Sequence, residues 1–104
     1  MDYKVALTED AENDFERHIK YLIDVKLNIQ AARNVANDFE ETKDILSKVA
    51  SSIQLCTNPR LNKLGYRRIN YRRHDYFMLY RIVDGMVIVD NIFHFLEDYE
   101  NKMI

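Results

Sequence analysis

The 104-residue sequence is poor in the residues that support covalent or metal-bound chemistry. Cys56 is its single cysteine, so the chain can form neither an internal disulfide nor a cysteine-based metal site. Two glycines, Gly65 and Gly85, are too few for a glycine-rich phosphate-binding loop, and no Gly-x-Ser-x-Gly motif occurs. The three histidines lack metal-ligand spacing. We therefore expect no metal and no cofactor, and nothing favours hydrolysis by a metal or a serine nucleophile.

Long apolar segments are also absent. No run approaches the roughly 20 residues that a membrane-spanning helix needs. Charged residues begin at Asp2 and Lys4, which argues against a secretory signal peptide. We expect a cytoplasmic protein that does not associate with membranes, folded as one domain over residues 1–104.

The charged residues are unevenly distributed although the net charge is only −2. Between Leu55 and Val83 seven Lys or Arg residues accompany one acid, Asp75, whereas the segments on both sides are acidic. A basic segment of this kind is typical of proteins that bind an anionic partner. Arginines also suit phosphate or carboxylate groups, and the neighbouring aromatic rings can stack on bases. The candidate anion-binding residues are Arg67, Arg68, Arg72, Arg73 and Arg81. An equally weighted alternative is that these arginines are solvated or paired within the chain.

The first half of the chain has the pattern of a strand followed by two helices. Alternating apolar residues over positions 1–7 predict a short strand. Thr8 is a suitable N-cap for a helix that runs to about Val25, and Asn28 can cap a second helix that continues to Ile53. Because the connection is short, the two helices should form an antiparallel hairpin. Tyr3, Val5 and Leu7 should share one side of this strand, and Asp2, Lys4 and Ala6 the other.

The second half is rich in β-branched and aromatic residues, as a sheet requires. Strands are predicted at residues 66–71, 76–83 and 86–94, after a linker from Leu55 to Gly65. Asp84-Gly85 between the last two strands predicts a type I′ hairpin turn. Strict alternation in the last strand would place Val87, Val89, Asn91 and Phe93 on one face.

The predicted fold is therefore α+β: an N-terminal strand, a long antiparallel helical hairpin, and a three-strand antiparallel meander, in the order β-α-α-β-β-β. The hairpin should cover one face of the sheet and leave a groove with apolar and basic walls. An acidic, amphipathic segment of a partner protein would fit such a groove and become ordered as it binds.

Two residues at the C-terminal end are candidates for acid–base chemistry. His94 ends the last strand beside the basic segment, where a histidine can move protons near neutral pH. Tyr99 follows five residues later and carries a hydroxyl. For both residues a structural role is an equally good interpretation, because such side chains commonly complete a core or a corner.

Several of these features together resemble the RelE/ParE superfamily of bacterial type II toxin–antitoxin toxins. The resemblance rests on the order of elements, on Tyr-x-x-x-Tyr-Arg-Ile at 76–82, on the Asp-Gly turn, and on Ile-Phe-His-Phe-Leu-Glu-Asp-Tyr at 92–99. It implies a small cytoplasmic toxin neutralised by a cognate antitoxin, which is typically a DNA-binding repressor, so that operator DNA is contacted only through the antitoxin. RelE-like members cleave mRNA in the ribosomal A site, and ParE-like members poison DNA gyrase.

The residues that RelE-like nucleases would use are only partly present. Phe77 stands where an arginine is expected after the first tyrosine of the middle strand, and acidic residues follow the last strand where a basic residue is expected. Tyr99 arrives earlier than the tail tyrosine of those nucleases, and Asn70 replaces one of two basic positions, of which Arg68 matches the other. His94 is similar to a histidine that some ribonuclease relatives carry near this end. With the long helical hairpin, these departures indicate a ParE-like toxin.

Three functions remain as hypotheses from the sequence. The first is a ParE-like toxin with DNA gyrase as its target. The second is a ribosome-dependent endoribonuclease, in which the arginines would hold phosphates and His94 or Tyr99 would move protons. The third is a non-toxic binding module that only helps its antitoxin to repress their operon.

Overall fold

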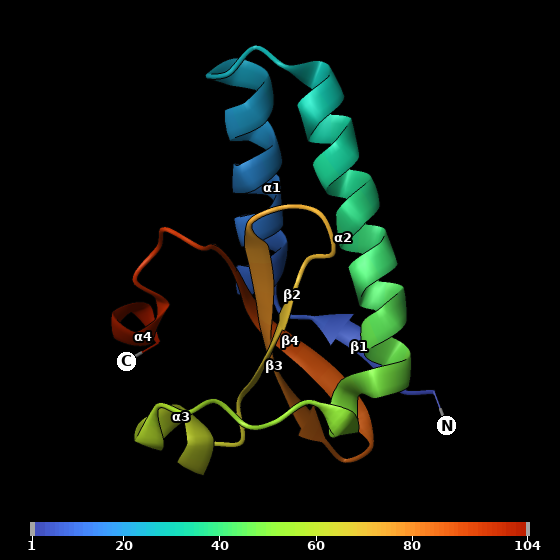
Figure 1. Ribbon diagram of the computed structural model, residues 1–104, viewed down its shortest axis with the longest axis vertical. Helices are drawn as coiled ribbons and strands as arrows, with labels where there is room; N and C mark the ends of the chain where they lie inside the picture. Colours follow the sequence, from blue (N-terminus) through green and yellow to red (C-terminus); the bar gives the residue numbers. More distant parts are fainter. Residues whose placement is uncertain (1, 104) are drawn as a thin grey trace.

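The computed structural model describes residues 2–103, so Met1 of the predicted first strand and Ile104 lie outside the described residues. The fold is α+β, as predicted, with a four-stranded sheet in the order β1-β4-β3-β2 (Figure 1). β2, β3 and β4 form the predicted antiparallel meander, whereas β1 pairs parallel to β4. The elements are β1 (Lys4–Leu7), α1 (Glu9–Asp24), α2 (Ile29–Val49), the 3-10 helix η1 (Ala50–Ser52), α3 (Pro59–Lys63), β2 (Arg67–Asn70), β3 (Tyr76–Val83), β4 (Met86–His94) and α4 (Tyr99–Lys102). The second helix, predicted to continue to Ile53, ends at Val49 and is followed by η1.

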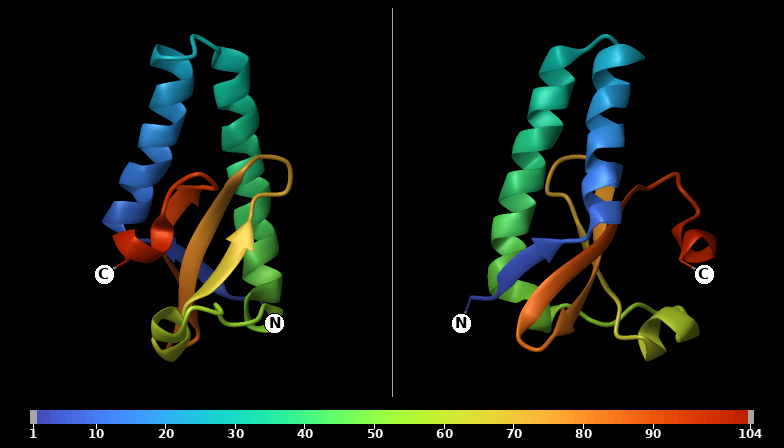
Figure 2. Two further views of the ribbon diagram at one scale, coloured as in Figure 1. Left: turned by 60° about the vertical axis from the view of Figure 1, so that its left-hand side comes forward. Right: turned by 180° about the vertical axis from the view of Figure 1, so that it is seen from behind.

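The helical hairpin begins at the two predicted caps. The Thr8 side chain accepts a hydrogen bond from the N–H of Ala11 at 3.1 Å, and the Asn28 side chain accepts one from Ala31 at 2.9 Å. Each cap satisfies a donor that the first turn of a helix leaves without an intrahelical partner. The two helices run antiparallel along one face of the sheet, and their connected ends stand clear of it (Figures 1 and 2).

The main core lies between the helical hairpin and the sheet. Tyr80 is completely buried there, and its hydroxyl donates to the carbonyl oxygen of Ala50 at 2.8 Å. Each large apolar side chain buried in this way contributes about 1.5–3 kcal/mol. Tyr3, just before β1, and Val5 and Leu7 of β1 all pack against this core, which confirms that they share one side. A second, smaller cluster covers the opposite face of the sheet, called here the outer face, and consists of Cys56, Leu61, Phe77, Leu79 and Phe93.

The segment predicted to be a linker contains a short helix, α3. Asn58 caps it by accepting hydrogen bonds from the N–H groups of Arg60 and Leu61 at 3.0 and 3.2 Å. Pro59 occupies its first turn, where a missing N–H has no cost because that donor would have no helical partner. The helix forms because the completely buried Leu61 anchors it on the outer face. The sequence analysis assigned this segment to a linker and did not predict the helix.

The strict alternation predicted for β4 is wrong, because this strand contains a β-bulge. The pairing register between β3 and β4 shifts between Leu79 and Tyr80, because Asp90 is an extra residue in β4. One extra residue exchanges the faces of all side chains that follow it. As a result Val87, Val89 and Ile92 lie in the core under the helices, whereas Phe93 lies on the outer face.

Asp38 of α2 holds the loop between β2 and β3 in place. Its carboxylate is completely buried and accepts hydrogen bonds from the N–H groups of Arg72 and Arg73 at 3.1 and 2.9 Å, and it meets Nδ1 of His74 at 2.7 Å. Burial acts to raise the pKa of Asp38, but the bonds from His74 and the two backbone groups outweigh it and lower that pKa below the usual 3.8. The ionised carboxylate therefore stabilises the loop.

We expect Asp38→Asn to lower the free energy of unfolding by about 2–3 kcal/mol at pH 7, because a neutral amide cannot accept these bonds equally well. A lowered folded-state pKa means that the stabilisation is present above the unfolded-state pKa and is lost as the pH falls below it. Urea unfolding at pH 7 and pH 3 measures both effects, and the difference between wild type and variant should shrink at the lower pH. Asp44→Asn, at an exposed position of the same helix, is the matched control and should change little. Equal stabilities of the two variants would contradict the role given to Asp38.

Candidate functional site

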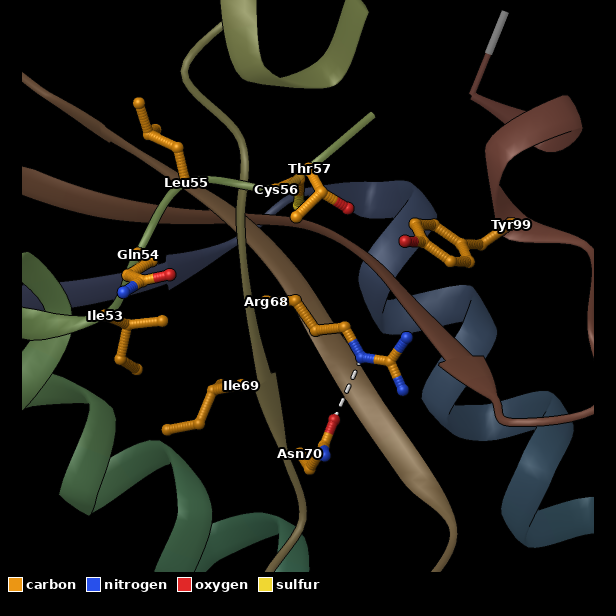
Figure 3. Close-up of a pocket in the computed structure, with 9 residues that line it drawn as sticks. All are labelled: Ile53, Gln54, Leu55, Cys56, Thr57, Arg68, Ile69, Asn70 and Tyr99. Carbon is orange, nitrogen blue, oxygen red and sulfur yellow. Dashed lines mark hydrogen bonds between the residues drawn. The ribbon is translucent and has the colours of Figure 1, made fainter. Parts of the chain in front are cut away.

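The outer face of the sheet brings together two of the predicted site residues, Arg68 and Tyr99. A cavity of about 410 Å³ lies between them, with residues 53–57 along a further side. Figure 3 shows the two side chains reaching over the sheet from different elements, Arg68 from β2 and Tyr99 from the start of α4. We call this group, Arg68 and Tyr99 with the cavity between them, the outer-face site.

Arg68 is oriented by aromatic rings. Its Cζ lies 3.7 Å from the ring centroid of Phe77, 5.2 Å from that of Phe95 and 5.6 Å from that of Tyr99. Its Nε donates to the side-chain oxygen of Asn70 at 2.9 Å. A guanidinium stacked on rings in this way keeps edge donors for another acceptor. Among residues 2–103 no carboxylate forms an ion pair with Arg68.

The other four predicted arginines do not join the outer-face site. Arg81 is held by Asp90 through bonds of 2.7 and 3.0 Å. The guanidinium groups of Arg72 and Arg73 lie 3.7 and 2.7 Å from the carboxylate of Glu41 on α2. Arg67 donates to the backbone carbonyl oxygens of Ser51 and Ile53, where α2 and the turn after it end. The basic segment is therefore divided among several parts of the molecule.

His94 lies on the opposite face of the sheet from Tyr99. The His94 ring packs edge-on against Tyr76 with centroids 5.0 Å apart, and its Nδ1 accepts the N–H of Leu96 at 3.1 Å. Tyr99 instead packs against Phe77 and Phe93 with centroids 5.0 and 5.9 Å apart. The two residues predicted to move protons are thus on different sides of the sheet, and the structure does not bring them together.

Glu97 anchors the C-terminal segment through contacts that sequence reasoning missed. One oxygen of its carboxylate accepts the N–H of His94 at 3.0 Å and faces Nε2 of His18 at 3.2 Å, and the other accepts from Lys102 at 2.8 Å. Burial acts to raise the pKa of Glu97, but the bonds from Lys102, His94 and His18 outweigh it and lower that pKa to about 2. The sequence offered one signal for this contact. His18 lies beside the apolar stripe of α1, and a buried histidine needs a hydrogen-bond partner.

Two general classes of site find no support within the described part of the chain. No group of three His, Cys, Asp or Glu side chains among residues 2–103 is placed to hold a metal ion. None of the described helices combines the length and apolar character that crossing a membrane requires.

The strand, the helical hairpin and the arginine-bearing meander define the class of small α+β toxins that includes RelE and ParE. The chain belongs to the ParE toxin family of type II toxin–antitoxin systems, because residues 5–99 match the family described as the ParE toxin of parDE. It is therefore the toxin component of such a system. The fold is similar to that of the chromosomal ParDE toxin–antitoxin system from P. aeruginosa, with a TM-score of 0.72 and 17% identity over 88% of this chain and 95% of that one. It is also similar to the toxin–antitoxin complex RelBE2 from Mycobacterium tuberculosis, with a TM-score of 0.62 and 23% identity over 90% and 99% of the two chains. No curated protein sequence matches the chain significantly.

We expect Glu97→Gln to lower the free energy of unfolding by about 2 kcal/mol at pH 7, because the C-terminal segment loses its charged anchor. With its pKa lowered from 4.5 to about 2 in the folded chain, Glu97 stabilises the fold above pH 4.5. That contribution is lost as the pH falls towards 2. Urea unfolding between pH 7 and pH 2.5 should therefore show wild type losing stability faster than Glu97→Gln. Glu16→Gln, an exposed carboxylate on α1, is the control, and parallel pH profiles for wild type and Glu97→Gln would contradict the anchoring role.

Proposed function

We propose that this chain is a growth-inhibiting toxin that acts on DNA gyrase in the cytoplasm and that a cognate antitoxin neutralises it. The proposal rests on membership of the ParE toxin family and on one geometric observation, the placement of His94 and Tyr99 on opposite faces of the sheet.

The separation of these residues argues against RNA cleavage. Cleavage by the 2′-hydroxyl requires a base, an acid and positive charge around one phosphate. Here His94 cannot act on a phosphate that Tyr99 contacts, and the Arg81 guanidinium is already bound by Asp90. A toxin that binds a protein target needs no such constellation.

Arg68 is the arginine best placed to contact the target. It is exposed to the cavity of the outer-face site, it is held by rings, and it has no carboxylate partner among residues 2–103. A guanidinium oriented in advance loses little side-chain freedom when it binds a carboxylate or phosphate of the partner.

Ribonuclease activity remains the second candidate because Arg68 and Tyr99 do share one cavity. In that case the Tyr99 hydroxyl would be essential. Tyr99→Phe keeps the ring that packs on Phe77 and removes only the hydroxyl, so it separates the two functions.

Induction of the chain in bacteria should arrest growth, and the purified chain should inhibit supercoiling by gyrase. Tyr99→Phe should remain as toxic as wild type, whereas Arg68→Ala should raise the concentration for half inhibition about tenfold, since a lost charge contact costs about 1.4 kcal/mol. Arg33→Ala, at an exposed position of α2, is the matched control. New mRNA ends at the ribosomal A site that disappear in Tyr99→Phe would establish the ribonuclease instead. Unimpaired growth with folded protein would favour the co-repressor module.

The connection between α1 and α2 offers an apolar surface for the antitoxin. Val25, Leu27 and Ile29 are 63%, 81% and 62% exposed, and the connection stands clear of the sheet in both figures of the whole chain (Figures 1 and 2). Adjacent exposed apolar side chains of this size mark a protein interaction surface. Leu27 also has a φ of 51°, a conformation that a leucine adopts only at a cost. We infer that apolar side chains of an antitoxin segment cover these residues, while operator DNA is contacted by the antitoxin alone.

Leu27→Asn tests this surface without adding strain, because asparagine tolerates a positive φ better than leucine does. It should leave the melting temperature unchanged or raise it slightly. It should weaken binding of the co-expressed antitoxin about tenfold, the cost of removing one well-buried apolar side chain from an interface. Titration calorimetry with the purified pair measures the affinity, and Lys20→Ala on the exposed part of α1 is the control. Unchanged affinity in Leu27→Asn would place the antitoxin elsewhere.

A further inference from the structure

The outer edge of the sheet, along β2, is covered over only part of its length. At the start of β2, Leu55 forms an isolated antiparallel bridge with Arg67. Next to it, the N–H of Cys56 donates to the carbonyl oxygen of Tyr66 at 2.9 Å. Beyond Arg67 this pairing stops, and residues 68–70 form a wall of the cavity of the outer-face site. A sheet edge that is left unpaired in this way can accept a further strand.

The backbone groups of Arg68 and Asn70 face this opening. Along an antiparallel strand, successive residues direct their N–H and C=O groups to opposite sides. The carbonyl oxygen of Tyr66 accepts from the segment before α3, away from β3, whereas the N–H of Tyr71 donates to Tyr76 at the start of β3, at 2.8 Å. Alternation between these two points directs the N–H and C=O of Arg68 and Asn70 away from β3. No other segment within residues 2–103 pairs with these groups.

The side chains beside this edge differ between the two faces of the sheet. On the outer face, Arg68 is the one charged side chain among the described residues that line the cavity. On the other face, Ile53 and Ile69 are half-buried against the main core. Figure 3 shows Arg68 and Ile69 pointing to opposite sides of β2. An added strand would bring every second side chain towards the guanidinium and the others towards the isoleucines, a pattern that fits an acidic residue between apolar ones.

We propose that the outer-face site binds an extended acidic segment of the target protein as a short additional strand beside β2. The backbone of Arg68 and Asn70 forms the ladder hydrogen bonds, and a carboxylate of the segment meets the Arg68 guanidinium. In this mode of binding the main-chain hydrogen bonds provide affinity and the side-chain contacts provide specificity. The inference rests on the proposed function, in which Arg68 contacts the target, and it names the part of the target that is recognised.

An acetylated and amidated Thr-Val-Glu-Val-Thr peptide tests strand addition on the purified full-length chain, without gyrase. In NMR spectra the peptide should shift the amide resonances of Arg68 and Asn70 and slow the exchange of both amides with solvent, because a new hydrogen bond protects them. We expect a Kd of about 1 mM or tighter. The same peptide with glutamine in place of glutamate should bind about threefold more weakly, because it lacks the charge contact.

Asn70→Pro and Asn70→Ala form a matched pair of variants. Both lose the side-chain amide, but only proline also removes the backbone N–H. Because that N–H faces away from β3, proline leaves the hydrogen bonds between β2 and β3 in place. Asn70→Pro should therefore bind the peptide about fivefold more weakly than Asn70→Ala. Equal affinities of the two folded variants would overturn the proposal. If Asn70→Pro does not fold, the exchange measurement on the wild-type chain decides the question.

Peptide binding and gyrase inhibition separate this inference from the proposed function. A chain that inhibits gyrase while the peptide leaves the Arg68 and Asn70 amides unprotected would overturn strand addition and leave the proposed function intact. A chain that binds the peptide at these amides without inhibiting gyrase would support strand addition and contradict the proposed target. A short RNA oligonucleotide that shifts these amides when the peptide does not would assign the site to RNA and overturn the inference.

Discussion

The structure depends on carboxylates that bind backbone N–H groups which the sheet leaves unpaired. Asp38 accepts from the loop between β2 and β3. Asp14 accepts from Ile92 at 2.9 Å, and Glu97 accepts from His94 at 3.0 Å, both on the part of β4 that extends past β1. Because a buried N–H without a partner costs free energy comparable to a lost hydrogen bond, these three side chains determine where the loops and the C-terminal segment lie. Asp38 and Asp14 join elements far apart in the sequence in this way, and Glu97 does so through its contact with His18.

The same pairing logic explains why the basic segment does not form a single surface. Composition identified an excess of positive charge between Leu55 and Val83, but composition does not say which carboxylates lie nearby in space. Folding brings Glu41 of α2 to two of the arginines and Asp90 of β4 to a third. Arg67 is bound to backbone carbonyl oxygens, so of the five predicted arginines Arg68 is the one left available, with aromatic rings and an amide as its neighbours.

Local patterns predicted much of the fold because they act over short distances. The bounds of β3 and β4, the type I′ turn with positive φ at Asp84 and Gly85, and both helix caps follow from neighbouring residues alone. The parallel pairing of β1 with β4 and the burial of Leu61 depend on contacts between distant segments, which no local pattern encodes. The role of Asp38 could have been suspected from the sequence. This residue lies next to the apolar stripe of α2, one position before Phe39, and a buried acid there needs a partner.

The bulge at Asp90 decides what chemistry the C-terminal half can perform. With strict alternation after Val87 and Val89, His94 would lie on the outer face with Arg68 and Tyr99, and a histidine, a tyrosine and an arginine would share one cavity. The extra residue moves His94 under α1, beside Tyr76 and near His18. The bulge is stable because α1 satisfies the backbone it frees: the Thr8 hydroxyl donates to the carbonyl oxygen of Asp90 at 2.7 Å, while the Asp90 side chain binds Arg81. One inserted residue, supported by Thr8 from 82 positions earlier in the chain, thus places His94 and Tyr99 on opposite faces of the sheet.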